Sequence, residues 1–175
     1  MAFLPIFAMP GTDMSNMATS TNFDNDEVQV SIEDKRVERA AKIEKYYTDR
    51  SMPLAKHSMD FVLAAEKYGI DWRLLPAIAV RESSGGKRDM NNNPFGWGSA
   101  KIKYAGYKDS IESVAKNLGG ANPRTASYYG GKTNFEKLHA YNGTVMPSYP
   151  KEVLAIMDKI ESVQLVKVSN DLAEK

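Results

Sequence analysis

The stretch from Asp71 to Gly98, DWRLLPAIAVRESSGGKRDMNNNPFGWG, joins an apolar helical pattern to a segment rich in glycine and aromatic residues. Four of its residues are spaced i, i+3, i+4 and i+7, which places their side chains on one helical face: Leu75, Ile78, Ala79 and Glu82. Gly85 and Gly86 are predicted to end this helix. Glu82 is therefore expected in its last turn, on the buried face.

Two effects favour the protonated form of the Glu82 side chain. An ionised carboxylate is costly to bury among apolar side chains. The C-terminal end of a helix also carries a partial negative charge, which disfavours a second negative charge there. A carboxylic acid that keeps its proton near neutral pH can protonate the leaving oxygen of a glycosidic bond. The alternative interpretation is a glutamate that simply reaches water, because glutamate is rarely buried without a partner.

Three short blocks occur in order along the chain: Glu82-Ser83-Ser84-Gly85, Asn93-Pro94-Phe95-Gly96 and Ala140-Tyr141-Asn142-Gly143. In these blocks the chain resembles the lysozyme-like superfamily of peptidoglycan-cleaving enzymes, and most closely its glucosaminidase branch. Members of that branch show a helix ending in Glu-Ser-Gly, an Asn-x-Phe-Gly loop and an Ala-Tyr-Asn element before the last helix. The resemblance covers about residues 54 to 163.

The resemblance implies a mainly α, lysozyme-like helical domain that cleaves β-1,4 bonds between N-acetylated sugars of peptidoglycan. Such an enzyme would be an endo-N-acetylglucosaminidase, a related muramidase or a lytic transglycosylase. Glu82 matches the general acid of these enzymes. Tyr141 and Asn142 match positions that line the cleft, and a weaker correspondence makes Asn93 a further candidate for substrate binding.

Aromatic residues alternate with glycines between residues 91 and 107. Aromatic faces can stack on pyranose rings, and glycine lets a ligand approach the backbone closely. Phe95 and Trp97 are both candidate substrate-binding residues. We expect Phe95 mainly to pack in the core, while Trp97 either contacts sugar or fills the space under the loop. The segment is expected to form a loop or a short β-hairpin beside the cleft.

A second carboxylate would decide the reaction, because hydrolysis in the two common geometries needs a base or nucleophile across the bond. The candidates are Asp89, Asp109 and Glu112, and none stands out. Without a second carboxylate, the acetamido group of the substrate can attack internally, or the muramoyl 6-hydroxyl can attack to leave an anhydro sugar. Both routes need only one protein acid.

Composition excludes several other classes of function. Lys and Arg total 23 and Asp and Glu total 22, so no strong overall charge points to nucleic acid or an acidic membrane. The chain has no cysteine and only two histidines, His57 and His139, which makes thiolate chemistry and a His-rich metal site improbable. A serine nucleophile would need one of these histidines as its base, and the sequence contains no Gly-x-Ser-x-Gly motif, so catalysis by a serine nucleophile is not expected. We expect no metal and no cofactor.

Four segments are expected along the chain. These are a flexible leader at 1–32, a charged surface helix at 33–50, the catalytic domain at 51–163 and a tail at 164–175. Within the catalytic domain, the patterns predict helices at 54–68, from Asp71 through Glu82, at 109–118, at 134–141 and at 150–163. Asp71 and Asp109 are the predicted N-caps of two of them. Pro76 requires the second of these helices either to begin a residue or two later than an N-cap at Asp71 would place its start, or to be kinked in its first turn.

The apolar stretch Met1–Met9 lacks a positively charged start and has a proline in its centre, so we do not expect a signal peptide or a membrane span. The expected location is extracellular, in the cell envelope or in a phage virion, with peptidoglycan as partner and the protein as a monomer. A different class of function stays open. The domain could bind peptidoglycan without cutting it, or serve as a structural part of an envelope or phage assembly.

Overall fold

The computed structural model describes residues 22–166, and describes their side chains from residue 31 onward. The chain divides into two units, Met1–Glu33 and Asp34–Lys175. The hydrophobic core and the candidate site lie in the second unit. The predictions for residues 1–21 and 167–175 fall outside the described residues.

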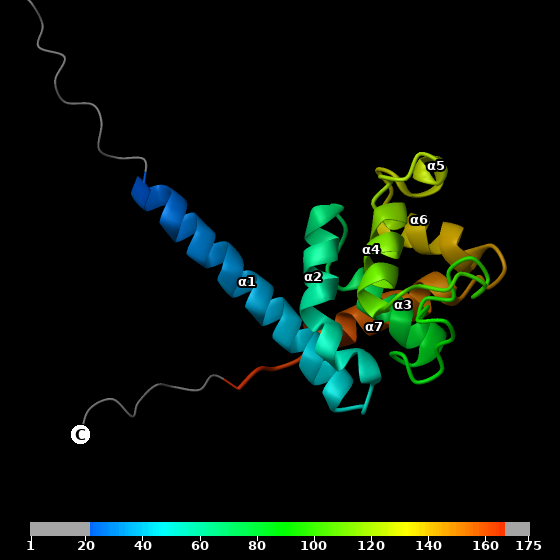
Figure 1. The fold of residues 1–175 in the computed structure, drawn as a ribbon, viewed down its shortest axis with the longest axis horizontal. Helices are drawn as coiled ribbons and strands as arrows, with labels where there is room; N and C mark the ends of the chain where they lie inside the picture. Colours follow the sequence, from blue (N-terminus) through cyan, green and yellow to red (C-terminus); the bar gives the residue numbers. More distant parts are fainter. Residues whose placement is uncertain (1–21, 167–175) are drawn as a thin grey trace, which may run out of the picture. The chain divides into compact units, whose positions relative to one another are not determined.

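The described part of the chain is mainly α, as predicted, and contains no strand. Its elements are α1 Asn22–Thr48, η1 Pro53–His57, α2 Ser58–Lys67, α3 Leu74–Ser83, α4 Tyr107–Leu118, α5 Ala126–Tyr129, α6 Asn134–Leu138, η2 His139–Gly143 and α7 Tyr149–Glu161. In the second unit, α3 packs most extensively against α7, and α2 lies beside α4 (Figure 1).

Residues 84–106, green in Figure 1, join α3 to α4 as a loop. Of the two predicted conformations for its aromatic part, the β-hairpin does not form. Several residues there have a positive φ, which interrupts extended backbone: Asn91, Asn92, Gly96, Gly98, Ser99 and Ala100.

Helix α1 begins at Asn22. The prediction of a flexible leader is therefore wrong for residues 22–32, which are helical. The prediction followed the polar composition of this segment, but no glycine or proline stands between Asn22 and Met52 to end a helix.

The part of α1 in the second unit is more than a surface helix. Its side chains Ile43 and Tyr47 are fully buried in the core. The Tyr47 hydroxyl donates a hydrogen bond of 2.8 Å to the carbonyl oxygen of Pro76 in α3. Residues 34–48 therefore fold together with residues 51–163 instead of forming the separate segment that we expected. The apolar residues of this helix are few and most of their neighbours are charged, but Tyr47 packs against the helix that carries Glu82.

Helix α3 begins at Leu74, two residues later than an N-cap at Asp71 would place its start, so the expectation of a later start is correct. Pro76 is its third residue, where a backbone N–H has no partner within the helix and its loss costs little. Asp71 is not the N-cap residue. Its carboxylate accepts hydrogen bonds from the backbone N–H of Arg73 (2.9 Å), the Arg73 guanidinium (2.7 Å) and the Asn134 side chain (3.2 Å). Asp71 thus links the start of α3 to the start of α6.

Asp71→Asn is expected to lower the free energy of unfolding by about 1 to 2 kcal/mol at neutral pH, because hydrogen bonds to a charged group are lost. Burial opposes ionisation of Asp71, but the hydrogen bonds from Arg73 outweigh it and hold the pKa of this carboxyl below its usual range. A carboxyl with a lowered folded pKa stabilises the protein above its unfolded pKa, and this contribution is lost as the pH falls through the folded pKa. Urea unfolding of both proteins should therefore show a difference at pH 7 that vanishes on acidification. A difference that is independent of pH would contradict this role.

Helix α4 begins at Tyr107, two residues before the predicted cap. Asp109 is consequently an exposed residue of the first turn, and its prediction as the N-cap, in a capping box with Glu112, is wrong. A capping box does form at α6. There the Thr133 hydroxyl accepts from the Glu136 N–H, and the Glu136 carboxylate accepts from the Thr133 N–H. The sequence carries the T-x-x-E pattern of this box at residues 133–136.

No helix within residues 22–166 has the length and apolar character that a membrane crossing requires.

Candidate active site

A cleft of about 510 Å³ lies where the end of α3, the aromatic loop and η2 meet. Nine residues line it: Glu82, Phe95, Gly96, Trp97, Gly98, Ser99, Tyr129, Tyr141 and Asn142. Five of the six candidate site residues from the sequence are therefore brought to one place, although they come from segments up to sixty residues apart. Of these lining residues, Glu82 is the one acid.

Glu82 is held by the sharp end of α3. Ser84 takes a left-handed conformation (φ 56°) directly after the helix, and its N–H bonds to the carbonyl of Val80. The buried Ser83 hydroxyl donates to the Ala79 carbonyl and accepts from the Gly86 N–H (3.0 Å for both). These bonds fix the last turn of α3 and with it the direction of the Glu82 side chain, which is partly exposed.

One oxygen of the Glu82 carboxyl group is bound and the other faces the loop. The Tyr149 hydroxyl, from the first residue of α7, donates a hydrogen bond of 2.6 Å to Oε1. Oε2 lies beside Gly96, where an added Cβ would be 3.5 Å away from it. Gly96 has a positive φ of 63°, a backbone conformation that favours glycine. The arrangement leaves Oε2 as the oxygen on the cleft side.

Tyr149 is fully buried and acts as a neutral donor. Burial, together with the nearby side chains of Tyr141 and Glu82, raises its pKa well above the ordinary value. Its ring stacks on that of Tyr141, with centroids 5.9 Å apart and planes at 4°. The Tyr141 hydroxyl in turn donates a hydrogen bond of 2.6 Å to the Phe95 carbonyl oxygen. The two tyrosines thus connect α7, η2 and the loop around the acid.

Trp97 extends this aromatic contact along the cleft. Its ring is partly exposed and lies 5.5 Å from the Tyr141 centroid and 6.0 Å from that of Tyr129. Phe95, by contrast, is fully buried and packs edge-on against Phe61. The ring of Phe95 is therefore a core residue, as expected, while its backbone belongs to the cleft.

Asn93 does not line the cleft. Its side chain is almost fully buried (2% exposed) and holds the loop closed. Its Oδ1 accepts from the Trp97 N–H at 3.0 Å, and its Nδ2 donates to the Trp97 carbonyl at 2.8 Å. These bonds position the Trp97 backbone. The Asn93 side chain therefore does not reach the cleft itself. Its predicted role in substrate binding stays a prediction.

The three other carboxylates considered from the sequence do not line the cleft either. Asp89 accepts a hydrogen bond of 3.0 Å from the Tyr107 hydroxyl. Glu112 forms an ion pair with Lys67 and accepts a hydrogen bond from the Tyr68 hydroxyl at the surface between α2 and α4. The hydrogen bonds from Lys67 and Tyr68 lower the pKa of Glu112. Asp109 is exposed. Among residues 22–166, therefore, no second acid lines this cleft opposite Glu82.

One residue beside the cleft was missed from the sequence. Tyr149 directly precedes Pro150 and was placed just outside the last helix, with no pattern to connect it with Glu82. The sequence also suggests that a polar, aromatic loop with Tyr128 and Tyr129 could line the cleft, and Tyr129 does line it. A further feature lies next to the acid: Arg81 forms an ion pair with Glu152 at 2.5 Å, and its guanidinium lies 5.8 Å from the Tyr149 ring centroid.

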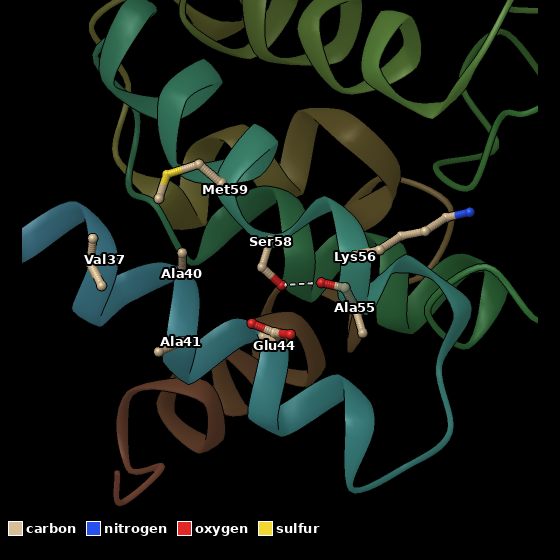
Figure 2. Close-up of a pocket in the computed structure, with 8 residues that line it drawn as sticks. All are labelled: Val37, Ala40, Ala41, Glu44, Ala55, Lys56, Ser58 and Met59. Atoms are coloured by element: carbon tan, nitrogen blue, oxygen red, sulfur yellow. Dashed lines mark hydrogen bonds between the residues drawn. The ribbon is translucent and has the colours of Figure 1, made fainter. Parts of the chain in front are cut away.

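A second hollow, of about 260 Å³, lies between α1, η1 and α2 (Figure 2). Its lining is mostly apolar, from residues such as Ala40, Ala55 and Met59. The Ser58 hydroxyl at its edge is already bonded to the Ala55 carbonyl at 2.6 Å. The one carboxylate among the residues that line this hollow, Glu44, is exposed on α1. This groove lacks the convergent polar groups that mark a catalytic site.

Among the described residues, no group of three or more acidic or histidine side chains is arranged to hold a metal ion. Comparison with known proteins adds no relative: no protein-family model, no curated protein and no solved structure matches this chain.

Proposed function

We propose that this protein cleaves β-1,4 glycosidic bonds in the glycan strands of peptidoglycan, with Glu82 as the general acid, and that its second unit is a lysozyme-like helical domain. The observation that carries the proposal is one carboxyl group in an aromatic-lined cleft, with Oε1 held by Tyr149 and Oε2 on the cleft side. The three sequence blocks that resemble glucosaminidases meet at this point.

In this mechanism, Oε2 of Glu82 gives its proton to the glycosidic oxygen as the bond breaks. The Tyr149 hydroxyl stays on Oε1 and stabilises the carboxylate that results. Because Tyr149 is buried and bonded, this donor is in place before the reaction and needs no reorganisation. Trp97 and Tyr141 offer aromatic surface against which the sugar rings pack.

The positive charge that develops on the sugar must then be met by something other than a second protein carboxylate, because none faces Glu82 in the cleft. Two intramolecular routes satisfy this geometry. The acetamido oxygen of the substrate can attack the anomeric carbon, and water then opens the intermediate, giving its proton to the Glu82 carboxylate and leaving a reducing end. Alternatively, the 6-hydroxyl of a muramoyl residue attacks the anomeric carbon, gives its proton to the Glu82 carboxylate and leaves a 1,6-anhydro end. The proposed activity covers both products.

The proposal is tested by incubating the purified protein with a peptidoglycan suspension and following its turbidity. We expect clearing by the wild-type protein, with soluble glycan fragments in the supernatant. A protein that sediments with peptidoglycan but never clears it, and that releases no fragment, would contradict the enzyme and favour a non-catalytic binding module. A protein that neither binds nor clears peptidoglycan would contradict both.

A further inference from the structure

An exposed aromatic residue lies next to the cleft, beyond the residues that line it. Tyr128 in α5 has 63% of its surface exposed. Its ring centroid is 6.4 Å from that of Tyr129, which in turn is 6.0 Å from Trp97. Together with Tyr141 and Tyr149, these rings form an unbroken row that starts at Glu82 and ends at the protein surface. We call it the aromatic row.

The segment that carries Tyr128 is held firmly although it lies at the surface. Gly120 and Gly130 bring its two ends into backbone contact, since a Cβ added at Gly120 would lie 2.5 Å from the Gly130 Cα. Oδ1 of the buried Asn117 accepts from the Asn122 side chain and the Thr125 hydroxyl, both at 2.8 Å. These contacts define the shape of residues 120–130.

A buried lysine fixes the same segment from below. Lys137 is 7% exposed, and its ammonium group donates to the Leu118 carbonyl at 2.7 Å and to the Tyr129 carbonyl. It therefore joins the end of α4 to the end of α5. An aromatic side chain on a backbone this well determined loses little conformational freedom when a ligand packs on it.

We infer that Tyr128 forms an outer sugar subsite, so that the enzyme binds glycan strands that extend from Glu82 along the aromatic row to Tyr128. This inference rests on the proposed function and adds to it a preference for long strands. Tyr129 and Tyr149 are buried and support the row, while Tyr141, Trp97 and Tyr128 offer accessible ring surface. Neighbouring ring centroids of the row are 5.5 to 6.4 Å apart, and three such contacts separate Tyr141 from Tyr128. We therefore expect a short substrate bound at Glu82 to leave Tyr128 without a sugar.

The test compares Tyr128→Ala with wild type on two substrates, long peptidoglycan glycan strands and a tetrasaccharide fragment of them. We expect the ratio of kcat/KM for long strands to kcat/KM for the tetrasaccharide to fall about threefold to tenfold, as for the loss of one aromatic contact. Phe135→Ala is the matched control, because Phe135 is also an exposed aromatic residue (49%) and lies outside the row. It should keep the wild-type ratio.

Binding gives a second readout that does not need catalysis. Glu82→Gln with and without Tyr128→Ala is titrated with the long strands, and we expect affinity to fall by a similar factor when Tyr128 is removed. An unchanged ratio and unchanged affinity in Tyr128→Ala would overturn the subsite, as would an equal effect of Phe135→Ala. If wild type clears peptidoglycan in the same series, the proposed function survives that result. If wild type neither cuts nor binds any of the strands, the proposed function itself fails.

Discussion

Glu82→Gln is expected to lower the rate of peptidoglycan cleavage by about a thousandfold while leaving the fold intact. Glutamine keeps the size of the side chain and can still accept the hydrogen bond from Tyr149, but it has no proton to give to the leaving oxygen. General acid catalysis contributes on the order of 10² to 10⁴ in rate, and no other acid of the cleft can replace it. The initial rate of clearing and the release of reducing or anhydro ends measure the loss.

Asp109→Asn is the matched control for this substitution. Asp109 was also a candidate carboxylate from the sequence, but it lies exposed in the first turn of α4 and does not line the cleft. The control should keep wild-type activity, and both variants should keep the wild-type melting temperature and circular dichroism. A folded Glu82→Gln variant with more than a tenth of the wild-type rate would refute the assignment of Glu82 as the acid.

Tyr149→Phe is expected to lower kcat about tenfold to a hundredfold, with little change in KM. Removal of the hydroxyl takes the donor away from Oε1, so the carboxyl group is no longer held with Oε2 toward the cleft and its carboxylate form loses a stabilising bond. The effect corresponds to about 1.4 to 2.7 kcal/mol of barrier. Steady-state kinetics on soluble glycan strands separates kcat from KM.

Tyr107→Phe provides the comparison for Tyr149→Phe. This substitution also removes a hydrogen bond from a tyrosine to a carboxylate, because the Tyr107 hydroxyl donates to Asp89 at 3.0 Å. Neither Tyr107 nor Asp89 lines the cleft. We expect wild-type kinetics from it. If the two variants lose activity equally, the effect of Tyr149→Phe reflects general loosening of the fold, and the positioning role of Tyr149 is wrong.

The sequence predicted the helical class and the end of α3 because both depend on local patterns. Apolar spacing, Pro76 near the start and the glycines after Glu82 act within a few residues of one another. The cleft-lining positions of Trp97, Tyr141 and Asn142 were expected from short blocks that resemble a family, and the structure brings them to Glu82. Their roles toward substrate stay predictions.

Other features depend on contacts between distant parts of the chain and could not be read locally. Tyr149 reaches Glu82 across 67 residues, and the packing of α7 on α3 brings them together. Asn93 belonged to a block associated with substrate, but its amide instead closes the loop around Trp97. The burial of Ile43 and Tyr47 was likewise hidden, because the charged neighbours on α1 made the helix look like a solvated one.

Mass spectrometry of the fragments released from purified peptidoglycan tests the proposed chemistry most directly. The mechanism predicts sugar fragments with new reducing or 1,6-anhydro ends and intact stem peptides, released by wild type and absent with Glu82→Gln. Intact glycan strands after prolonged incubation with the folded wild-type protein, or equal release of fragments by Glu82→Gln, would contradict it.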